Sequence, residues 1–272
     1  MLPHRPVSKA AQASSDSPPA AACHPLAEYI DHTRLVFDAS EPSFSQVAQL
    51  CREAVQYGFH AVCVHPAYVS QAKQLLRDTA VKVATVIGFP QGRLSLAAEK
   101  VSPTVGDLPI ELKISEIGTA LTDLADWGAD ELDIVARVRD IQHDVKTGSE
   151  QFLRSLCDMR AAAHGVPMKI ILETDLLTPE EIVFAVERCV QAGMSMVKTS
   201  TGMLDGAQCA QDESVIHLIL DTLSRCQQSI PEPQRVTLKA SGNIRTPEQA
   251  RRLIEMGVKR LGTSAGPAIC GN

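Results

Sequence analysis

The segment GADELDIVA at residues 128–136 decides the fold class, because it joins the end of a helical pattern to a short β-rich run. Gly128 stands where the helical pattern stops, and glycine readily takes the left-handed conformation that ends many helices. The run ELDIV follows after two residues and alternates acidic with apolar side chains. The segment therefore predicts a helix, a tight turn and a strand in direct succession.

The same unit recurs at Gly58 before HAVCV, at Gly193 before MVKTS and at Gly257 before RLGTS. Four further β-rich runs stand between these units: EYIDHT at 28–33, KVATVIGF at 82–89, MKIILET at 168–174 and VTLKAS at 236–241. The chain thus holds eight candidate strands. Helical patterns separate them at about 43–57, 67–78, 114–127, 149–163, 178–192, 207–226 and 246–256.

Strands that alternate with helices pair in parallel through crossover connections. Eight such strands close most simply into an α/β fold of the (β/α)8 TIM barrel type. The alternative is an open, doubly wound sheet. No G-x-G-x-x-G sequence follows any early strand, so the usual dinucleotide fingerprint of that alternative is missing.

The domain organisation follows from the length of 272 residues. Residues 1–22 are rich in Ala, Ser and Pro and hold almost no large apolar side chains, which predicts a disordered tail. The remaining residues, 23–272, match the size of a single (β/α)8 barrel. We therefore expect one domain preceded by the tail.

Composition excludes several partners and cofactors. The formal net charge is −6, which lacks the basic field that nucleic-acid binding needs, and no apolar run is long enough to span a membrane. The eight cysteines form no C-x-x-C pair, which favours reduced thiols and a cytoplasmic location. The histidines show no metal-binding spacing, so we expect no metal and no cofactor. A homodimer remains open as an assembly.

Three ionisable residues within the β-rich runs are candidates for catalysis. Strand residues alternate between the barrel interior and the helix-covered face, and the apolar neighbours suit the helices. Asp133, Lys198 and Lys239 should therefore point inward, as should Glu131, near the carboxyl ends of strands four, six and seven. A buried lysine beside another cation is partly neutral and can attack a carbonyl to form a Schiff base. Alternatively, the two lysines reach solvent, or Asp133 merely neutralises one of them.

Small residues follow strands six, seven and eight and predict a binding site for a phosphorylated substrate. Backbone N–H groups and hydroxyls in such loops surround an anion, and the loops after strands seven and eight form the common phosphate site of barrels. Ordinary turns would have the same composition. The candidate binding residues are Thr201, Gly202, Ser241, Gly242, Asn243, Gly262, Ser264 and Ala265.

Several motifs together resemble the deoxyribose-phosphate aldolase family. They run in order through all eight candidate strands: YIDHT, VCVHP, ATVIGFP, GADELDIV, KIILET, MVKTSTG, LKASGNIRT and LGTSAG. The resemblance implies a metal-free class I aldolase that cleaves 2-deoxy-D-ribose 5-phosphate reversibly to acetaldehyde and D-glyceraldehyde 3-phosphate. It also implies that Lys198 forms the Schiff base, that Lys239 perturbs it, and that Asp133 relays protons.

The resemblance further implies that Asp31 and Thr33 lie near the substrate hydroxyl and the proton relay, although Asp31 could equally cap a turn. Cys63 should face the interior as an inert small side chain. The chain departs from the family at Asn243, where a second glycine is usual, and at Met203, where phenylalanine or lysine is common.

A long segment, 93–112, follows the third strand and is either a lid over the site or a passive insertion. Two other functions stay open at this point. One is another lysine-dependent barrel aldolase that acts on a ketose phosphate, and the other is a catalytically silent barrel that binds sugar phosphates.

Overall fold

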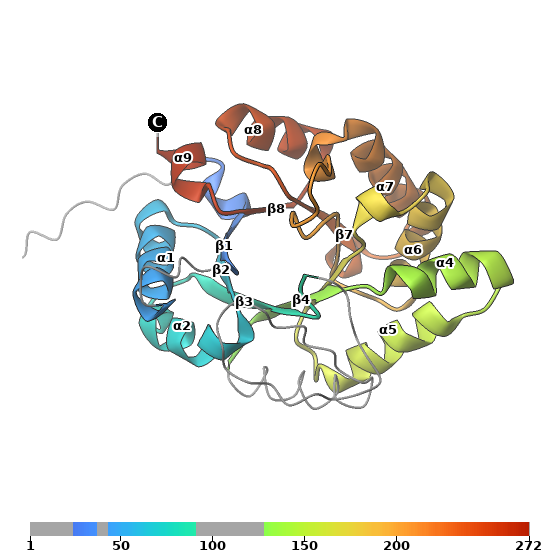
Figure 1. Ribbon diagram of the computed structural model, residues 1–272, viewed down its shortest axis with the longest axis horizontal. Coiled ribbons are helices and arrows are strands. Elements are labelled where there is room, and N and C mark those ends of the chain that lie inside the picture. The colour runs from blue at the N-terminus through green and yellow to red at the C-terminus, as the bar shows by residue number, and fades with distance from the viewer. Residues whose placement is uncertain (1–23, 37–42, 91–127, 272) are drawn as a thin grey trace, which may run out of the picture.

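The computed structural model describes residues 24–36, 43–90 and 128–271, and in these residues eight parallel strands close into a barrel in chain order. Figure 1 shows the strands as a ring with the helices around it. The ring closes because β8 pairs with β1, with Leu261 opposite Ile30. The strands are β1 (Ile30–Arg34), β2 (Ala61–Val64), β3 (Lys82–Ile87), β4 (Glu131–Val135), β5 (Met168–Ile171), β6 (Met196–Lys198), β7 (Thr237–Ser241) and β8 (Arg260–Thr263). The predicted barrel is confirmed, and the open sheet is excluded.

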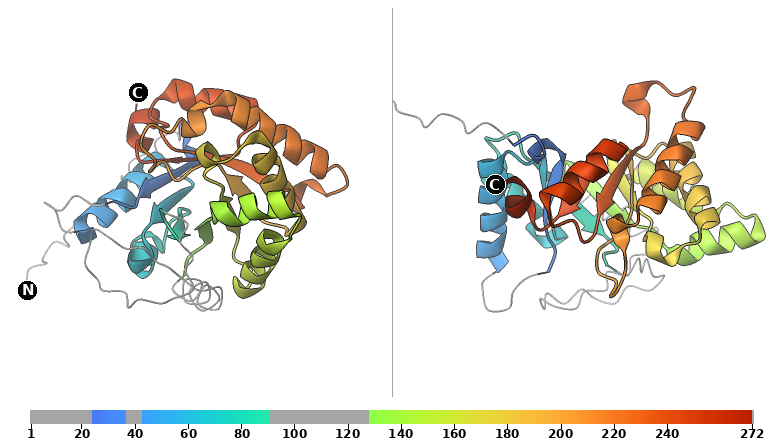
Figure 2. Two further views of the ribbon diagram at one scale, coloured as in Figure 1. Left: turned by 45° about the vertical axis from the view of Figure 1, so that its right-hand side comes forward. Right: turned by 90° about the horizontal axis from the view of Figure 1, so that it is seen from above.

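Helices cover the outside of the barrel, as the two further views in Figure 2 show. The α-helices are α1 (Ser43–Tyr57), α2 (Val69–Leu76), α4 (Val138–Thr147), α5 (Gln151–Ala162), α6 (Pro179–Gln191), α7 (Glu213–Cys226), α8 (Pro247–Met256) and α9 (Gly266–Cys270). Short 3-10 helices are η1 (Ala27–Tyr29), η2 (Pro66–Tyr68), η3 (Thr174–Leu176), η4 (Cys209–Gln211) and η5 (Glu232–Gln234).

Most of the predicted helices agree with these bounds, but α4 and the short α9 were missed. The helix α4 is short and has only two buried residues, Ile141 and Asp144, although its apolar side chains Val138, Ile141 and Val145 do recur at helical spacing. The predicted pattern at 207–226 also proves shorter. Its first part is η4 and irregular chain, and α7 begins only after Asp212, whose carboxylate accepts the N–H groups of Ser214 and Val215.

The glycines that end the repeated units have the predicted left-handed conformation. Their φ angles are 72° at Gly58, 92° at Gly128, 66° at Gly193 and 114° at Gly257. At Gly58, Gly193 and Gly257 the turn returns the chain from an outer helix to the next strand. The repeated pattern in the sequence thus records the winding of the barrel.

The interior of the barrel is divided into an apolar and a charged side. On β2 and β3, the inward residues Cys63, Ala84 and Val86 form a small apolar cluster. The inward residues of β1 and β4–β8 include buried acids and bases. A separate, larger apolar core lies between the strands and the helices. The charged side of the interior is where the candidate site lies.

Three of the sequence predictions lie outside the described residues: the tail at 1–22, the helical pattern at 114–127 and the segment at 93–112. Within the described part of the chain, no helix is both long and apolar enough to cross a membrane.

Candidate active site

The structure brings the three predicted ionisable residues together on one carboxylate oxygen. The Lys198 ammonium donates to Oδ2 of Asp133 at 2.9 Å, and the Lys239 ammonium donates to the same oxygen at 2.8 Å. The alternative of lysines in solvent is excluded, because Lys198 is 4% exposed and Lys239 is fully buried. Nor does Asp133 serve one lysine alone, since both contact it.

A third buried lysine, Lys169 on β5, belongs to the same network and was missed in the sequence. Its ammonium lies 2.7 Å from Oδ1 of Asp133 and 2.7 Å from Oε2 of Glu131. The alternation that placed Asp133 inward gives the same answer for β5. Ile170 packs in the outer core and Lys169 points inside. The signal was therefore present in the sequence.

Arg260 on β8 is the second missed cation, and it links Asp31 to the rest of the network. Its Nη1 lies 2.9 Å from Oδ1 of Asp31 and 3.1 Å from Oε2 of Glu131. The other oxygen of Asp31 accepts from the ammonium of Lys239. Asp31 therefore caps no turn. It lies fully buried among the cations, whereas Thr33 lines the pocket above.

The electrostatics separate the two predicted lysines. Burial lowers the pKa of Lys198, and the nearby charge of Lys239 lowers it further against the opposing effect of Asp133. Burial also disfavours the charged form of Lys239, but Asp133 and Asp31 outweigh it and raise the pKa of that lysine. Lys198 is thus the better source of a neutral amine, and Lys239 remains an ammonium.

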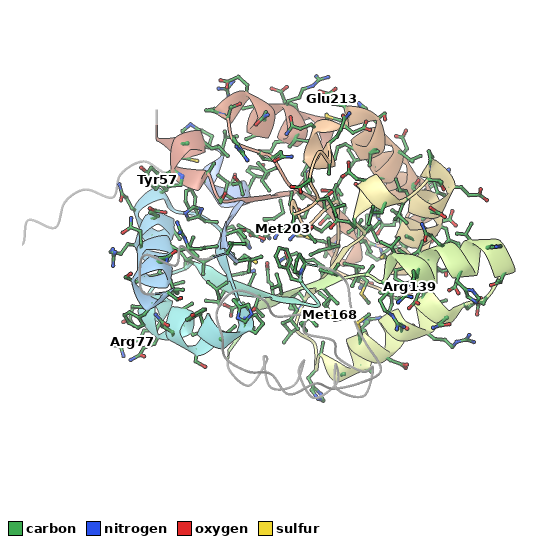
Figure 3. All side chains as sticks on the ribbon, in the orientation of Figure 1. Tyr57, Arg77, Arg139, Met168, Met203 and Glu213 are labelled. Carbon is green, nitrogen blue, oxygen red and sulfur yellow. The ribbon has the colours of Figure 1, made fainter. Side chains whose placement is uncertain are left out.

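A pocket of about 480 Å³ opens above this network and reaches Lys198. Figure 3 shows Met203, one of its lining residues, within the ring of strands. The lining residues are Thr33, Arg34, Leu35, Val36, Phe89, Lys198, Thr201, Gly202, Met203, Ser241, Gly242, Asn243, Ile244, Arg245, Gly262, Thr263 and Ser264. A carbonyl compound in this pocket would therefore meet the amine of Lys198, with Asp133 and Lys239 beneath it.

Most predicted binding residues line this pocket, but Ala265 does not. The N–H of Ala265 donates to the Thr263 hydroxyl at 2.9 Å, and the Ala265 carbonyl accepts from the N–H of Ile269 within α9. The position of Ala265 therefore serves the turn from β8 into α9. Arg34 and Arg245 add cationic side chains to the lining that the sequence analysis did not single out.

The loops after β6 and β7 approach each other through two glycines. A Cβ atom built on Gly202 would lie 3.0 Å from Cα of Gly242, and both residues have positive φ angles, 78° and 93°. Asn243, the departure from the family pattern, also adopts a left-handed conformation with φ 58°. The backbone carbonyl of Asn243 accepts from the Gln211 side chain, and the side-chain amide of Asn243 donates to the Ala207 carbonyl. The asparagine is thus compatible with the loop.

Glu173, which follows β5 and precedes η3, holds the loop after β6 and was also missed. Its carboxylate accepts the Thr201 N–H at 3.2 Å and the Thr201 hydroxyl at 2.5 Å. Burial raises the pKa of Glu173, although these bonds oppose the shift. No spacing rule in the sequence could show this contact, because 28 residues separate its partners.

Gly262 on β8 provides the space in which Lys239 lies. A Cβ atom at this position would lie 2.9 Å from Cβ of Ser241 and 3.1 Å from Cε of Lys239. The glycine therefore permits the close approach of β7 and β8 around the lysine.

Within the described residues, no group of three or more histidine, cysteine or acidic side chains could hold a metal ion. Three of the buried carboxylates, those of Asp31, Glu131 and Asp133, instead contact lysine and arginine side chains.

The fold and the site together define a parallel α/β-barrel enzyme whose pocket ends on a buried lysine. The chain belongs to the DeoC/LacD family of aldolases, whose model matches residues 26–270. The resemblance found in the motifs is thereby confirmed.

The similar proteins of known name are deoxyribose-phosphate aldolases. A deoxyribose-phosphate aldolase of Thermococcus gammatolerans is 38% identical over 249 residues, which is 90% of this chain and 94% of that protein. A deoxyribose-phosphate aldolase of Thermosynechococcus vestitus is 41% identical over 239 residues, covering 88% of this chain and 93% of its own length. The solved deoxyribose phosphate aldolase of Aeropyrum pernix superposes with a TM-score of 0.67 at 27% identity, covering 90% of this chain and 89% of that structure.

Proposed function

We propose that this chain is a class I aldolase that cleaves 2-deoxy-D-ribose 5-phosphate reversibly to acetaldehyde and D-glyceraldehyde 3-phosphate. The observation that carries the proposal is Lys198, a buried lysine of lowered pKa that reaches the pocket and shares one oxygen of Asp133 with Lys239. The names of the relatives support the choice of substrate.

The reaction begins when the neutral amine of Lys198 attacks C1 of the open-chain aldehyde. The carbinolamine then loses water to give a protonated imine, with Asp133 moving the proton that this loss requires. The C3 hydroxyl passes its proton to the Asp133 relay, which later returns it to C2. The C2–C3 bond breaks, and its electron pair moves into the iminium to form an enamine. Glyceraldehyde 3-phosphate leaves at this step. Protonation of the enamine at C2 and hydrolysis then release acetaldehyde and the amine.

The phosphate would lie against the loops after β6, β7 and β8. Gly202, Gly242 and Ser264 line the pocket there, and the glycines leave their N–H groups accessible to an anion at close range. The left-handed backbone at Gly242 and Asn243 is the kind of turn that forms an anion-binding concavity. Lys198 lines the same pocket, so one substrate can contact the amine and these loops together.

Reductive trapping tests the proposal directly. Borohydride in the presence of acetaldehyde should reduce the imine to a stable ethyl group on Lys198, which peptide mass mapping locates. Lys198→Ala should lose both this adduct and the cleavage of deoxyribose 5-phosphate, because no other group would form the covalent imine. Lys146→Ala on the exposed end of α4 is a matched control and should keep both. An adduct that persists elsewhere in Lys198→Ala would contradict the assignment.

A cytoplasmic location belongs to the same proposal. Its support is that five cysteines of the described part of the chain are free thiols: Cys51, Cys63, Cys157, Cys189 and Cys226. The homodimer stays a prediction that sedimentation would check.

A further inference from the structure

The barrel interior beneath the pocket holds an unequal number of opposite charges. Among the described residues, the interlinked buried side chains there comprise four cationic groups and three carboxylates. The cations are Lys169, Lys198, Lys239 and Arg260, and the acids are Asp31, Glu131 and Asp133. An uncompensated charge is costly in such a site, so the network is most stable when one cation loses its proton.

The contacts indicate which cation this is. Lys169 has all three carboxylates within 3.6 Å, whereas Lys239 and Arg260 each contact two. Lys198 contacts Asp133 alone and shares that oxygen with Lys239. A guanidinium does not lose its proton in proteins. Lys198 is therefore the least compensated of the three lysines.

Two further titratable groups act on Lys198. The Cys63 thiol is neutral at ordinary pH, because burial raises its pKa to about 11. Glu173, after β5, accepts a hydrogen bond from the Thr201 hydroxyl, and its negative charge interacts with Lys198. Neither group is an ion-pair partner of Lys198 in the described structure, where that lysine pairs with Asp133.

We propose that Glu131, Lys169 and Arg260 are positioning residues that set the amine fraction of Lys198 through the charge count of the barrel interior. In the part of the chain that the structure describes, none of the three lines the substrate pocket. The proposal rests on the proposed function, since it takes Lys198 as the nucleophile. It assigns the tuning of that nucleophile to residues on three different strands in addition to Lys239.

Lys169 carries the effect along the barrel. Its ammonium forms ion pairs with both Oδ1 of Asp133 and Oε2 of Glu131. Glu131 in turn lies 3.4 Å from Nε2 of His60 and 3.5 Å from the ammonium of Lys82. Lys82 is 47% exposed in its side chain, so solvent screens its charge. The tightly coupled part of the network therefore ends at Glu131.

Opposite substitutions should move Lys198 in opposite directions. Glu131→Gln removes a negative charge, so the ammonium form of Lys198 becomes less favourable and its pKa falls. Lys169→Met removes a positive charge and frees an oxygen of Asp133, so the pKa of Lys198 rises. Both effects act through Asp133, which contacts Lys169 through one oxygen and Lys198 through the other. The double variant restores the count and should return close to the original value.

The measurement is the pH dependence of acetaldehyde trapping on Lys198 with cyanoborohydride, followed by intact mass and peptide mapping. The midpoint should move to lower pH in Glu131→Gln, to higher pH in Lys169→Met, and back in the double variant. Lys82→Gln is the matched control. It removes a solvent-screened positive charge that lies near Glu131, so it should shift the midpoint little.

Midpoints that coincide, or that move in the same direction in both single variants, would overturn the inference. The proposed function would still stand in that case, provided that the unaltered enzyme is trapped on Lys198. Trapping on another lysine, or on none, in the unaltered enzyme would overturn both. If Lys169→Met does not fold, the acid shift in Glu131→Gln alone decides, because a purely structural role for Glu131 predicts no such shift.

Discussion

Replacing Gly262 with alanine tests how closely the barrel must hold Lys239. The new methyl group would lie 2.9 Å from Cβ of Ser241 and 3.1 Å from Cε of Lys239. Carbon atoms pack at about 3.5–4.0 Å, so both neighbours would have to retreat by roughly 0.5–1 Å. Cβ of Ser241 is attached directly to β7 and can move only with the strand. The Lys239 side chain can bend away from the methyl group, but the contact with Ser241 is relieved only if β7 and β8 shift apart, and that shift also displaces Lys239.

The cost follows from the contacts of that lysine. The Lys239 ammonium lies between Asp31 and Asp133, so any retreat lengthens bonds to charged partners. Overpacking of this kind costs about 1–3 kcal/mol. At about 2–4 °C per kcal/mol, Tm should fall by about 2–12 °C. A displacement near 1 Å at the reacting groups should lower kcat by about a hundredfold.

Thermal unfolding and a coupled assay for glyceraldehyde 3-phosphate measure the two effects. Gly165→Ala is the control, since its site after α5 has φ +89° and no other atom within 4 Å of the added Cβ. The left-handed backbone costs alanine about 1–2 kcal/mol there, so Tm falls similarly while kcat stays unchanged. Normal kcat in a folded Gly262→Ala enzyme would refute the reasoning.

Three further substitutions probe the charges of the site. Lys239→Leu should raise the pKa of Lys198 by removing a like charge, so the optimum for deoxyribose 5-phosphate cleavage moves to higher pH as the rate falls; an unshifted profile would argue against the coupling. Ser264→Asp should raise KM for deoxyribose 5-phosphate about tenfold more than KM for deoxyribose, because it brings a negative charge to the proposed phosphate site; equal changes would place the phosphate elsewhere. Asp31 has its pKa lowered from 3.8 to about 2, so its stabilising contribution is full above about pH 4 and is lost as the pH falls toward 2. Asp31→Asn should therefore be less stable at neutral pH and should show about 2 kcal/mol less acid destabilisation in urea melts; an identical pH dependence would contradict this value.

The order of strands and helices could be predicted from the sequence, because the signals that determine it are local. In each repeated unit a glycine separates the helical pattern from the strand, and strand residues alternate between two faces with a period of two. That period also placed Asp133, Lys198 and Lys239 in the interior before any contact was known. The same period holds for Lys169 and Arg260. Both lie in quoted β-rich runs but went unrecognised, because each stands at the amino-terminal start of its strand, away from the end where barrel active sites lie.

The partners of these side chains were decided only by closure of the barrel. Lys239 and Asp31 are 208 residues apart, and Arg260 and Asp31 are 229 apart, yet each pair is in contact because β7, β8 and β1 are neighbours in the ring. The contact between Gly202 and Gly242 likewise joins two separate loops.

The protonation of Lys198 depends on the tertiary structure in the same way. Its pKa reflects burial and the sum of charges contributed by several strands, and no single segment contains that sum. The sequence by itself determined which residues face the interior, since that is a property of each strand. Which lysine is the amine was decided by the folded barrel, since electrostatic energy depends on distances between segments that only the fold brings together.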